Sequence, residues 1–146
     1  MTSKEKFKAY ASAYVILMKD GQVLLSRRAN TGYRDGMYSL VAGHFEGGET
    51  AKQCIMREAA EEAGISLNPD DLEVAYCLHR LSLDREYFDV FLTAEKWQGE
   101  IVNMEPEKCG GLEWFPLNDL PTEVIPEVRQ AIEHIGQGIH FGEIGW

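Results

Sequence analysis

The chain has 146 residues, of which 45% are hydrophobic and 26% are charged, and its formal net charge is −10. This length fits a single domain, residues 1–146, that is large enough to bury a real core. The acidic balance argues against a surface that binds nucleic-acid polymers, and no segment approaches the ~20 apolar residues of a membrane helix.

The first part of the chain predicts a β-hairpin and a helix. Residues 10–18 and 23–28 flank an Asp20-Gly21 turn and predict two paired strands. A polar loop at 29–36 and a short strand at 38–42, ending at Gly43, come next. Residues 50–63 predict the clearest helix, because Thr50 and Gln53 form a capping box and Gly64 follows as a stop signal.

The second part predicts three more strands and a second helix. The β-rich segments are residues 72–83, 86–95 and 112–115, and Pro126 opens a helix with an apolar face. The Gly-rich tail at 136–146 has no assignment. We therefore predict an α/β (α+β) domain in which a mixed β-sheet is sandwiched between helices.

The cysteines indicate a reducing compartment. The chain has an odd number of cysteines, and no two of them have the spacing of a metal-binding pair; they are Cys54, Cys77 and Cys109. The apolar residues 9–18 follow several lysines, as in a signal peptide, but they lead into the hairpin turn with no small-residue cleavage site. These features predict a cytoplasmic protein.

Three glutamates carry the main chemical signal. Glu58, Glu61 and Glu62 are spaced i, i+3 and i+4, so they project from one face of the predicted helix. Like charges at this spacing destabilise a helix by about 0.2–0.5 kcal/mol per pair. They also lie in the last turns, where the helix dipole disfavours negative charge.

Two interpretations of this acidic face are open. It is a solvated surface, which is the usual fate of a charge run, or it binds a hard divalent cation that offsets the repulsion. Carboxylates together with substrate phosphates form a typical magnesium environment. Such an ion would also let an acidic protein accept a polyphosphate.

The segment around these glutamates resembles the Nudix box, the signature of the Nudix hydrolase superfamily. Ala59 is a soft match, because a bulkier aliphatic residue is commoner there, and Ala42 stands where related sequences often have glycine. The order of predicted strands and helices also resembles the Nudix fold over most of the chain. The residues that match the signature are Gly43, Glu49, Arg57, Glu58, Ala59, Glu61, Glu62, Gly64 and Ile65.

The resemblance implies a role for each matched position. Arg57 and Glu49 would pair and hold the catalytic helix to its loop, and the glycines at 43, 47 and 48 would let the loop turn tightly. One of Glu58, Glu61 and Glu62, or a glutamate from elsewhere, would activate the attacking water. The implied ligands of Mg²⁺, or of Mn²⁺ as its substitute, are Glu58, Glu61, Glu62 and the backbone carbonyl of Gly43.

The sequence signals for a further acidic site residue and for a substrate pocket are less specific than the match to the Nudix box. Glu105 lies where MutT-like relatives often carry an extra metal-binding or basic glutamate; the alternative is a polar surface turn beside Pro106. Arg28 and Arg34 would contact phosphates or a base edge, unless they are solvated surface arginines. Tyr87 and Phe88 would stack on a base, unless they belong to the core.

The resemblance predicts an enzyme that hydrolyses a (deoxy)nucleoside triphosphate to a monophosphate and diphosphate. One alternative is another nucleoside diphosphate linked to a group X, such as ADP-ribose, a dinucleotide, a nucleotide sugar or coenzyme A. A second alternative is a non-catalytic nucleotide sensor, which the complete glutamate set disfavours. The expected partner is a small nucleotide, without a nucleic-acid polymer or a membrane, and a homodimer stays open.

Overall fold

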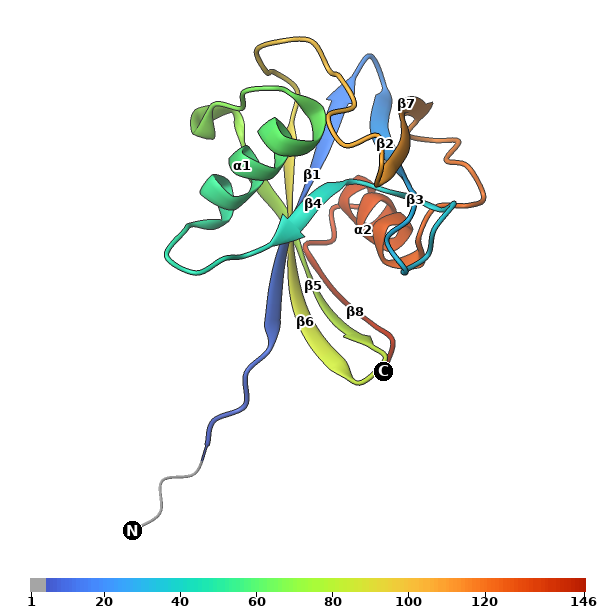
Figure 1. Ribbon diagram of the computed structural model, residues 1–146. Helices are drawn as coiled ribbons and strands as arrows, with labels where there is room; N and C mark the ends of the chain where they lie inside the picture. The colour runs from blue at the N-terminus through green and yellow to red at the C-terminus, as the bar shows by residue number, and fades with distance from the viewer. Residues whose placement is uncertain (1–4) are drawn as a thin grey trace.

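The computed structural model describes residues 5–146. Figure 1 shows a central sheet with one helix on either side of it. The elements in chain order are β1 (Tyr10–Lys19), β2 (Gln22–Arg28), β3 (Tyr38–Ser39), β4 (Val41–His44), α1 (Ala51–Ala63), the short 3₁₀ helix η1 (Pro69–Asp71), β5 (Glu73–Ser82), β6 (Arg85–Ala94), β7 (Cys109–Pro116), α2 (Pro126–Gly136) and β8 (Phe141–Ile144).

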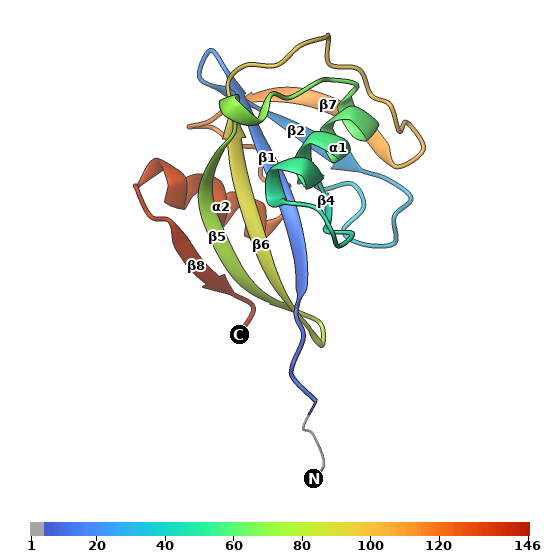
Figure 2. The same cartoon turned by 90° about the vertical axis from the view of Figure 1, so that its left-hand side faces the viewer.

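The sheet is mixed, because it contains both parallel and antiparallel strand pairs. Its strands follow the order β3-β2-β1-β6-β5-β8, while β4 pairs with β1 and β7 pairs with β2. β1 runs parallel to β6 over eight residue pairs and antiparallel to β4. Figure 2 shows β1, β6, β5 and β8 side by side. The predicted hairpin forms, but β1 and β2 pair only next to their turn, through Met18–Val23 and Lys19–Gln22.

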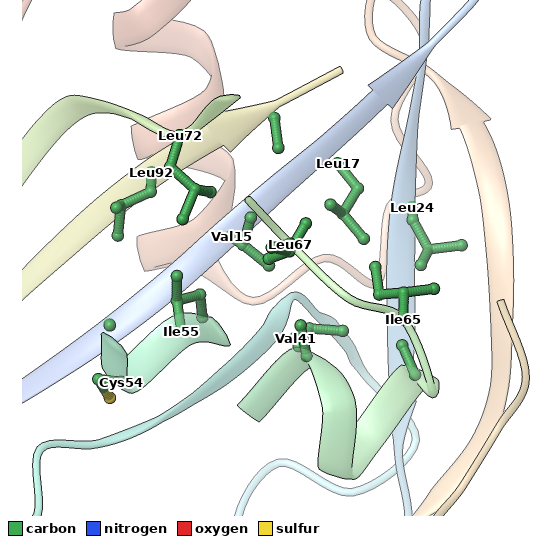
Figure 3. Close-up of a cluster of buried hydrophobic side chains, with 14 residues drawn as sticks. Val15, Leu17, Leu24, Val41, Cys54, Ile55, Ile65, Leu67, Leu72 and Leu92 are labelled. Carbon is green, nitrogen blue, oxygen red and sulfur yellow. The ribbon is translucent and has the colours of Figure 1, made fainter. Parts of the chain in front are cut away.

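The alternation of side chains along the strands places a core on each face of the sheet. Val15 and Leu17 of β1 pack with Ile55 of α1, in the cluster that Figure 3 shows. Ile16, between them in the sequence, points to the other face and packs with Val128 of α2. The predicted mixed sheet between two helices is therefore confirmed.

Two predicted details differ in the structure. The segment 38–42, expected as one strand, divides into β3, which pairs with β2, and β4, which pairs with β1 and continues through Gly43 to His44. The unassigned tail contributes β8, which runs parallel to β5 at the edge of the sheet. Both differences arise from long-range pairing, which short sequence patterns do not encode.

Within residues 5–146, no helix is both long enough and apolar enough to cross a bilayer. The predicted single domain also included residues 1–4, which lie outside the described part of the chain. The strands of the sheet and the two helices that pack on its faces lie within residues 5–146.

Candidate active site on helix α1

Local sequence fixes where α1 begins and ends. Thr50 caps the helix and accepts a hydrogen bond from the backbone N–H of Gln53, whose side chain accepts one in return from the backbone N–H of Thr50. Gly64 ends the helix in the left-handed conformation, with φ 67°. The loop before the helix turns through Gly47 and Gly48, whose φ angles of 81° and 70° favour glycine.

Arg57 joins the helix to this loop. Its Nη2 donates to Glu49 Oε1 at 2.9 Å and its Nε donates to Glu49 Oε2 at 3.3 Å. The Arg57 guanidinium and the backbone N–H of Glu46 lower the pKa of Glu49 to about 2. The pairing that the resemblance implied is therefore present, and it fixes the loop against the first turns of α1.

Gly43 lies directly against the Glu58 side chain. A Cβ atom added at Gly43 would overlap the Glu58 carboxyl, so any larger residue here requires the Glu58 side chain to move. The φ angle of Gly43 is not positive, in contrast to those of Gly47 and Gly48. Its role is close contact, whereas the sequence interpretation gave all three glycines a role in turning the loop. β4 thus brings its backbone next to the acidic face of α1.

The three predicted metal ligands have different surroundings. Glu61 is exposed over 53% of its side chain, whereas Glu58 is exposed over only 14%. Glu62 Oε2 is buried and has no hydrogen-bond partner among the described residues. Burial, together with the nearby carboxyls of Glu58 and Glu105, raises the pKa of Glu62 to about 10.

Arg57 also occupies the centre of this acidic face. Its Nη1 donates to Glu58 at 2.5 Å and lies 3.6 Å from Glu61 and 3.5 Å from Glu46. In the described part of the chain, no three carboxylate, histidine or cysteine side chains converge as a metal site. Glu58 would therefore have to turn from Arg57 to share an ion with its neighbours.

The residues present nevertheless fit a hard divalent cation. The donors are all oxygens, as magnesium prefers. A cation beside the orphaned Glu62 oxygen would favour the ionised form that burial disfavours. The absence of a side chain at Gly43 also leaves room for the Glu58 carboxyl beside the β4 backbone. These features support a cation site at the junction of α1 and β4.

The structure places Glu105 beside this group. The carboxyl of Glu105 is near enough to raise the pKa of Glu62. The loop that carries Glu105 is held by its own turn: Asn103 accepts from the backbone N–H of Glu105, and the backbone carbonyl of Glu105 accepts from Lys108 and Cys109. The fold thus brings together two acidic segments that are far apart in the sequence.

A trough runs away from Gly43 on the other side of β4. The first part of the trough has a volume of about 120 Å³. It shares four lining residues with the second part, and its other lining residues are Ser12, Ser39, Ala42, Gly43, Ile125 and Glu127. The second part has a volume of about 580 Å³ and reaches the hairpin between β5 and β6. The two parts share Tyr14, Arg28, Tyr33 and His44.

The four predicted substrate-binding residues are not all in this trough. Arg28 and Tyr87 line it, whereas Arg34 and Phe88 do not. Arg28 donates to the carbonyl of Tyr33 at 2.7 Å, so it braces the loop at 29–36. Phe88 points to the opposite face from Tyr87, because neighbouring strand residues alternate, and it stacks on His79 at 4.3 Å.

Sequence reasoning missed a buried polar group at the floor of the trough. Arg80 of β5 donates to Asp89 of β6 through Nε at 2.6 Å and Nη2 at 3.2 Å. Glu127 of α2 lies 3.9 Å from Arg80 and accepts from the Tyr33 hydroxyl at 3.1 Å. The available signal was two opposite charges, Arg80 and Asp89, within otherwise apolar strand segments, which are rare unless paired.

A family model described as NUDIX domain matches residues 6–135. A relative from Stutzerimonas stutzeri (strain A1501), named NAD-capped RNA hydrolase NudC, is 32% identical over 124 residues, which are 83% of this chain and 40% of that protein. A relative of the same name from Pseudomonas entomophila (strain L48) is 33% identical, over 85% of this chain and 42% of that protein. The chain therefore spans about two fifths of the length of these relatives.

Solved structures share the fold. The MutT NUDIX hydrolase from Burkholderia pseudomallei superposes with a TM-score of 0.80 at 24% identity, covering 87% of this chain and 98% of that one. The MutT protein from Methanosarcina mazei Go1 gives 0.77 at 18% identity, covering 92% and 97%. At this identity the likeness supports the fold, and the family match confirms the predicted Nudix class.

Proposed function

Because the chain belongs to the NUDIX domain family, we propose that it hydrolyses a phosphoanhydride bond of a nucleoside diphosphate linked to a further group X. The single observation that carries this proposal is the buried Glu62 oxygen without a partner, on a helix face that also presents Glu58 and Glu61. A buried carboxyl of this kind is characteristic of a site that is completed by a cation.

We propose Mg²⁺ as that cation, with Mn²⁺ as its substitute, held by Glu58, Glu61, Glu62 and the carbonyl of Gly43. The ion would neutralise phosphate charge and lower the pKa of a bound water. Arg57 contacts protein groups: it holds the loop before α1 through Glu49, and it lies beside Glu58 and Glu61. It would position these two carboxylates, because an arginine cannot itself bind the cation.

The base that takes the proton of the attacking water would be one of three carboxylates. Glu61 is the most exposed of the α1 set, Glu58 lies next to Gly43, and Glu105 approaches Glu62 from another loop. A general base must reach the proton that it removes. A comparison of Glu58→Gln, Glu61→Gln and Glu105→Gln by their pH–rate profiles would identify it.

The substrate proposed first is a (deoxy)nucleoside triphosphate, cleaved to a monophosphate and diphosphate. The trough beside Gly43 supports a nucleoside at this position, because Tyr33 and Tyr87 line it and aromatic rings stack on bases. The second candidate is a dinucleotide, which the names of the two NudC relatives favour. We propose a cytoplasmic protein, and a small nucleotide as its substrate.

The test is a product assay on the purified protein. The panel contains nucleoside triphosphates, NAD, ADP-ribose, nucleotide sugars, coenzyme A and an RNA with a 5′ NAD cap, each with Mg²⁺, Mn²⁺ or EDTA. Diphosphate and monophosphate from triphosphates support the first substrate class. Two monophosphate products from NAD support the second, and cleavage of capped RNA alone would overturn the small-nucleotide proposal.

A further inference from the structure

A buried group of charged side chains lies at the floor of the trough. The carboxylates of Asp89 and Glu127 share the guanidinium of Arg80, and Arg28 and Arg85 also line the trough. Arg80 gives its two short hydrogen bonds to Asp89, and its nearest approach to Glu127 is 3.9 Å. Glu127 therefore shares the Arg80 cation with Asp89 at the longer distance, and only 8% of its side chain is exposed.

One oxygen of Glu127 is held and the other is free. Oε1 accepts from the Tyr33 hydroxyl, whereas Oε2 accepts no hydrogen bond from residues 5–146. The buried side-chain atoms without a partner in this part of the chain belong to Glu62 and His79. Glu127 Oε2 is thus open to the trough, which Glu127 lines.

The surroundings hold this carboxylate in place. The Arg80 guanidinium lies 4.0 Å from the centre of the Tyr87 ring, and Tyr14 stacks on Phe91 at 4.5 Å. Desolvation, together with the charge of Asp89, raises the pKa of Tyr14, so its hydroxyl stays neutral. The trough therefore offers aromatic walls and, at its floor, a fixed carboxylate whose Oε2 accepts from no donor in residues 5–146.

We propose that Glu127 is the base-reading residue of this trough and selects a base with two adjacent N–H donors, which among the common bases is guanine. This inference rests on the proposed function for the site as a whole. A carboxylate only accepts, so the free Oε2 and the second lone pair of Oε1, beside the Tyr33 hydroxyl, match the ring N–H and exocyclic amine of guanine side by side. Adenine and cytosine place a ring acceptor next to their amine, which would face the carboxylate with like polarity.

The first experiment removes the donor from the ligand, so that the protein is unchanged. Binding of GMP, IMP, AMP and CMP to the metal-free protein is measured by calorimetry. We expect GMP to bind most tightly, and IMP, which lacks the exocyclic amine, to bind more weakly. The whole edge contact is worth about 5- to 150-fold in affinity. Equal affinity for GMP and AMP, or no binding of any monophosphate, would overturn the inference.

The second experiment changes the acceptor. Glu127→Gln presents one acceptor and one donor, a pattern that matches the amine and ring nitrogen of adenine. The ratio of GMP affinity to AMP affinity is expected to fall by about 5- to 150-fold or to invert. Glu133→Gln is the matched control, because Glu133 lies on the same helix with 54% of its side chain exposed and does not line the trough. An unchanged ratio in a folded Glu127→Gln variant would overturn the inference.

Binding and turnover separate this inference from the proposed function. A guanine preference in binding, with no phosphoanhydride cleavage of any substrate, would sink the hydrolase proposal and leave Glu127 as the base reader. Cleavage that depends on Mg²⁺ with equal kcat/KM for GTP, ITP and ATP would support the hydrolase and overturn the role of Glu127. A preference for guanine in both binding and turnover would support both the hydrolase proposal and the role of Glu127.

Discussion

Arg57 contacts Glu49 through two separate hydrogen bonds, from Nη2 to Oε1 at 2.9 Å and from Nε to Oε2 at 3.3 Å. The pair joins the second turn of α1 to the residue before its N-cap. Because a two-point contact with a planar guanidinium fixes orientation as well as distance, it determines where the loop lies relative to the acidic face.

Arg57→Lys is expected to lower kcat by on the order of 100-fold, because lysine keeps the charge but cannot hold Glu49 at two points. The fold should persist, since the side chain is 24% exposed. Steady-state kinetics and circular dichroism check this. Arg129→Lys on α2 is the control, because Arg129 lies outside both the acidic face and the trough. Normal turnover in Arg57→Lys would show that the loop position does not depend on the pair.

The same pair predicts a loss of stability in acid. The pKa of Glu49 is lowered from its ordinary value of 4.5 to about 2, so its ionised form is favoured in the folded state. Its contribution to stability is fully present above pH 4.5 and is lost as the pH falls toward 2. The midpoint of urea unfolding of Glu49→Gln should change less than that of the wild type between pH 5 and pH 2.5. Parallel curves for the two proteins would contradict this.

Gly43→Ala tests the close contact between β4 and Glu58. The added Cβ would overlap the Glu58 carboxyl, so Glu58 has to move, and kcat/KM is expected to fall by on the order of 100-fold. Gly136→Ala is the matched control, because nothing lies near the added atom and the residue is in α2. Equal kinetics for the two variants would mean that the Glu58 position is not important for turnover.

Glu62→Gln is expected to stabilise the metal-free protein while removing activity. Burial and the carboxyls of Glu58 and Glu105 disfavour the ionised form of Glu62, and a neutral amide removes this penalty, which is worth about 1–3 kcal/mol. The cation site loses a charged ligand, so kcat should fall by several orders of magnitude. Urea unfolding with EDTA and with excess Mg²⁺ measures both effects. Magnesium should stabilise the wild type much more than the variant, and equal stabilisation would remove Glu62 from the site.

Sequence patterns with a short range predicted much of the fold and the acidic face. The capping box of Thr50 and Gln53 and the glycine at 64 set both ends of α1, as expected, because capping depends on residues within one turn. The helical spacing of Glu58, Glu61 and Glu62 likewise follows from the helix period alone. The pairing of Arg57 with Glu49 was implied by the family resemblance and is present in the structure.

The way in which distant segments meet depends on strand pairing and packing across the whole fold. Periodicity did not reveal that the segment 38–42 divides between two pairing partners or that the tail adds β8, because strand pairing depends on partners far along the chain. The strand pattern also did not predict that the Phe88 side chain lies outside the trough. Glu127, 38 residues beyond Asp89 in the numbering, comes to lie beside Arg80 because α2 packs on β5. The acidic face of α1 follows from residue spacing within one helix, which is local, whereas the opposite wall of the site exists only because distant segments pack together.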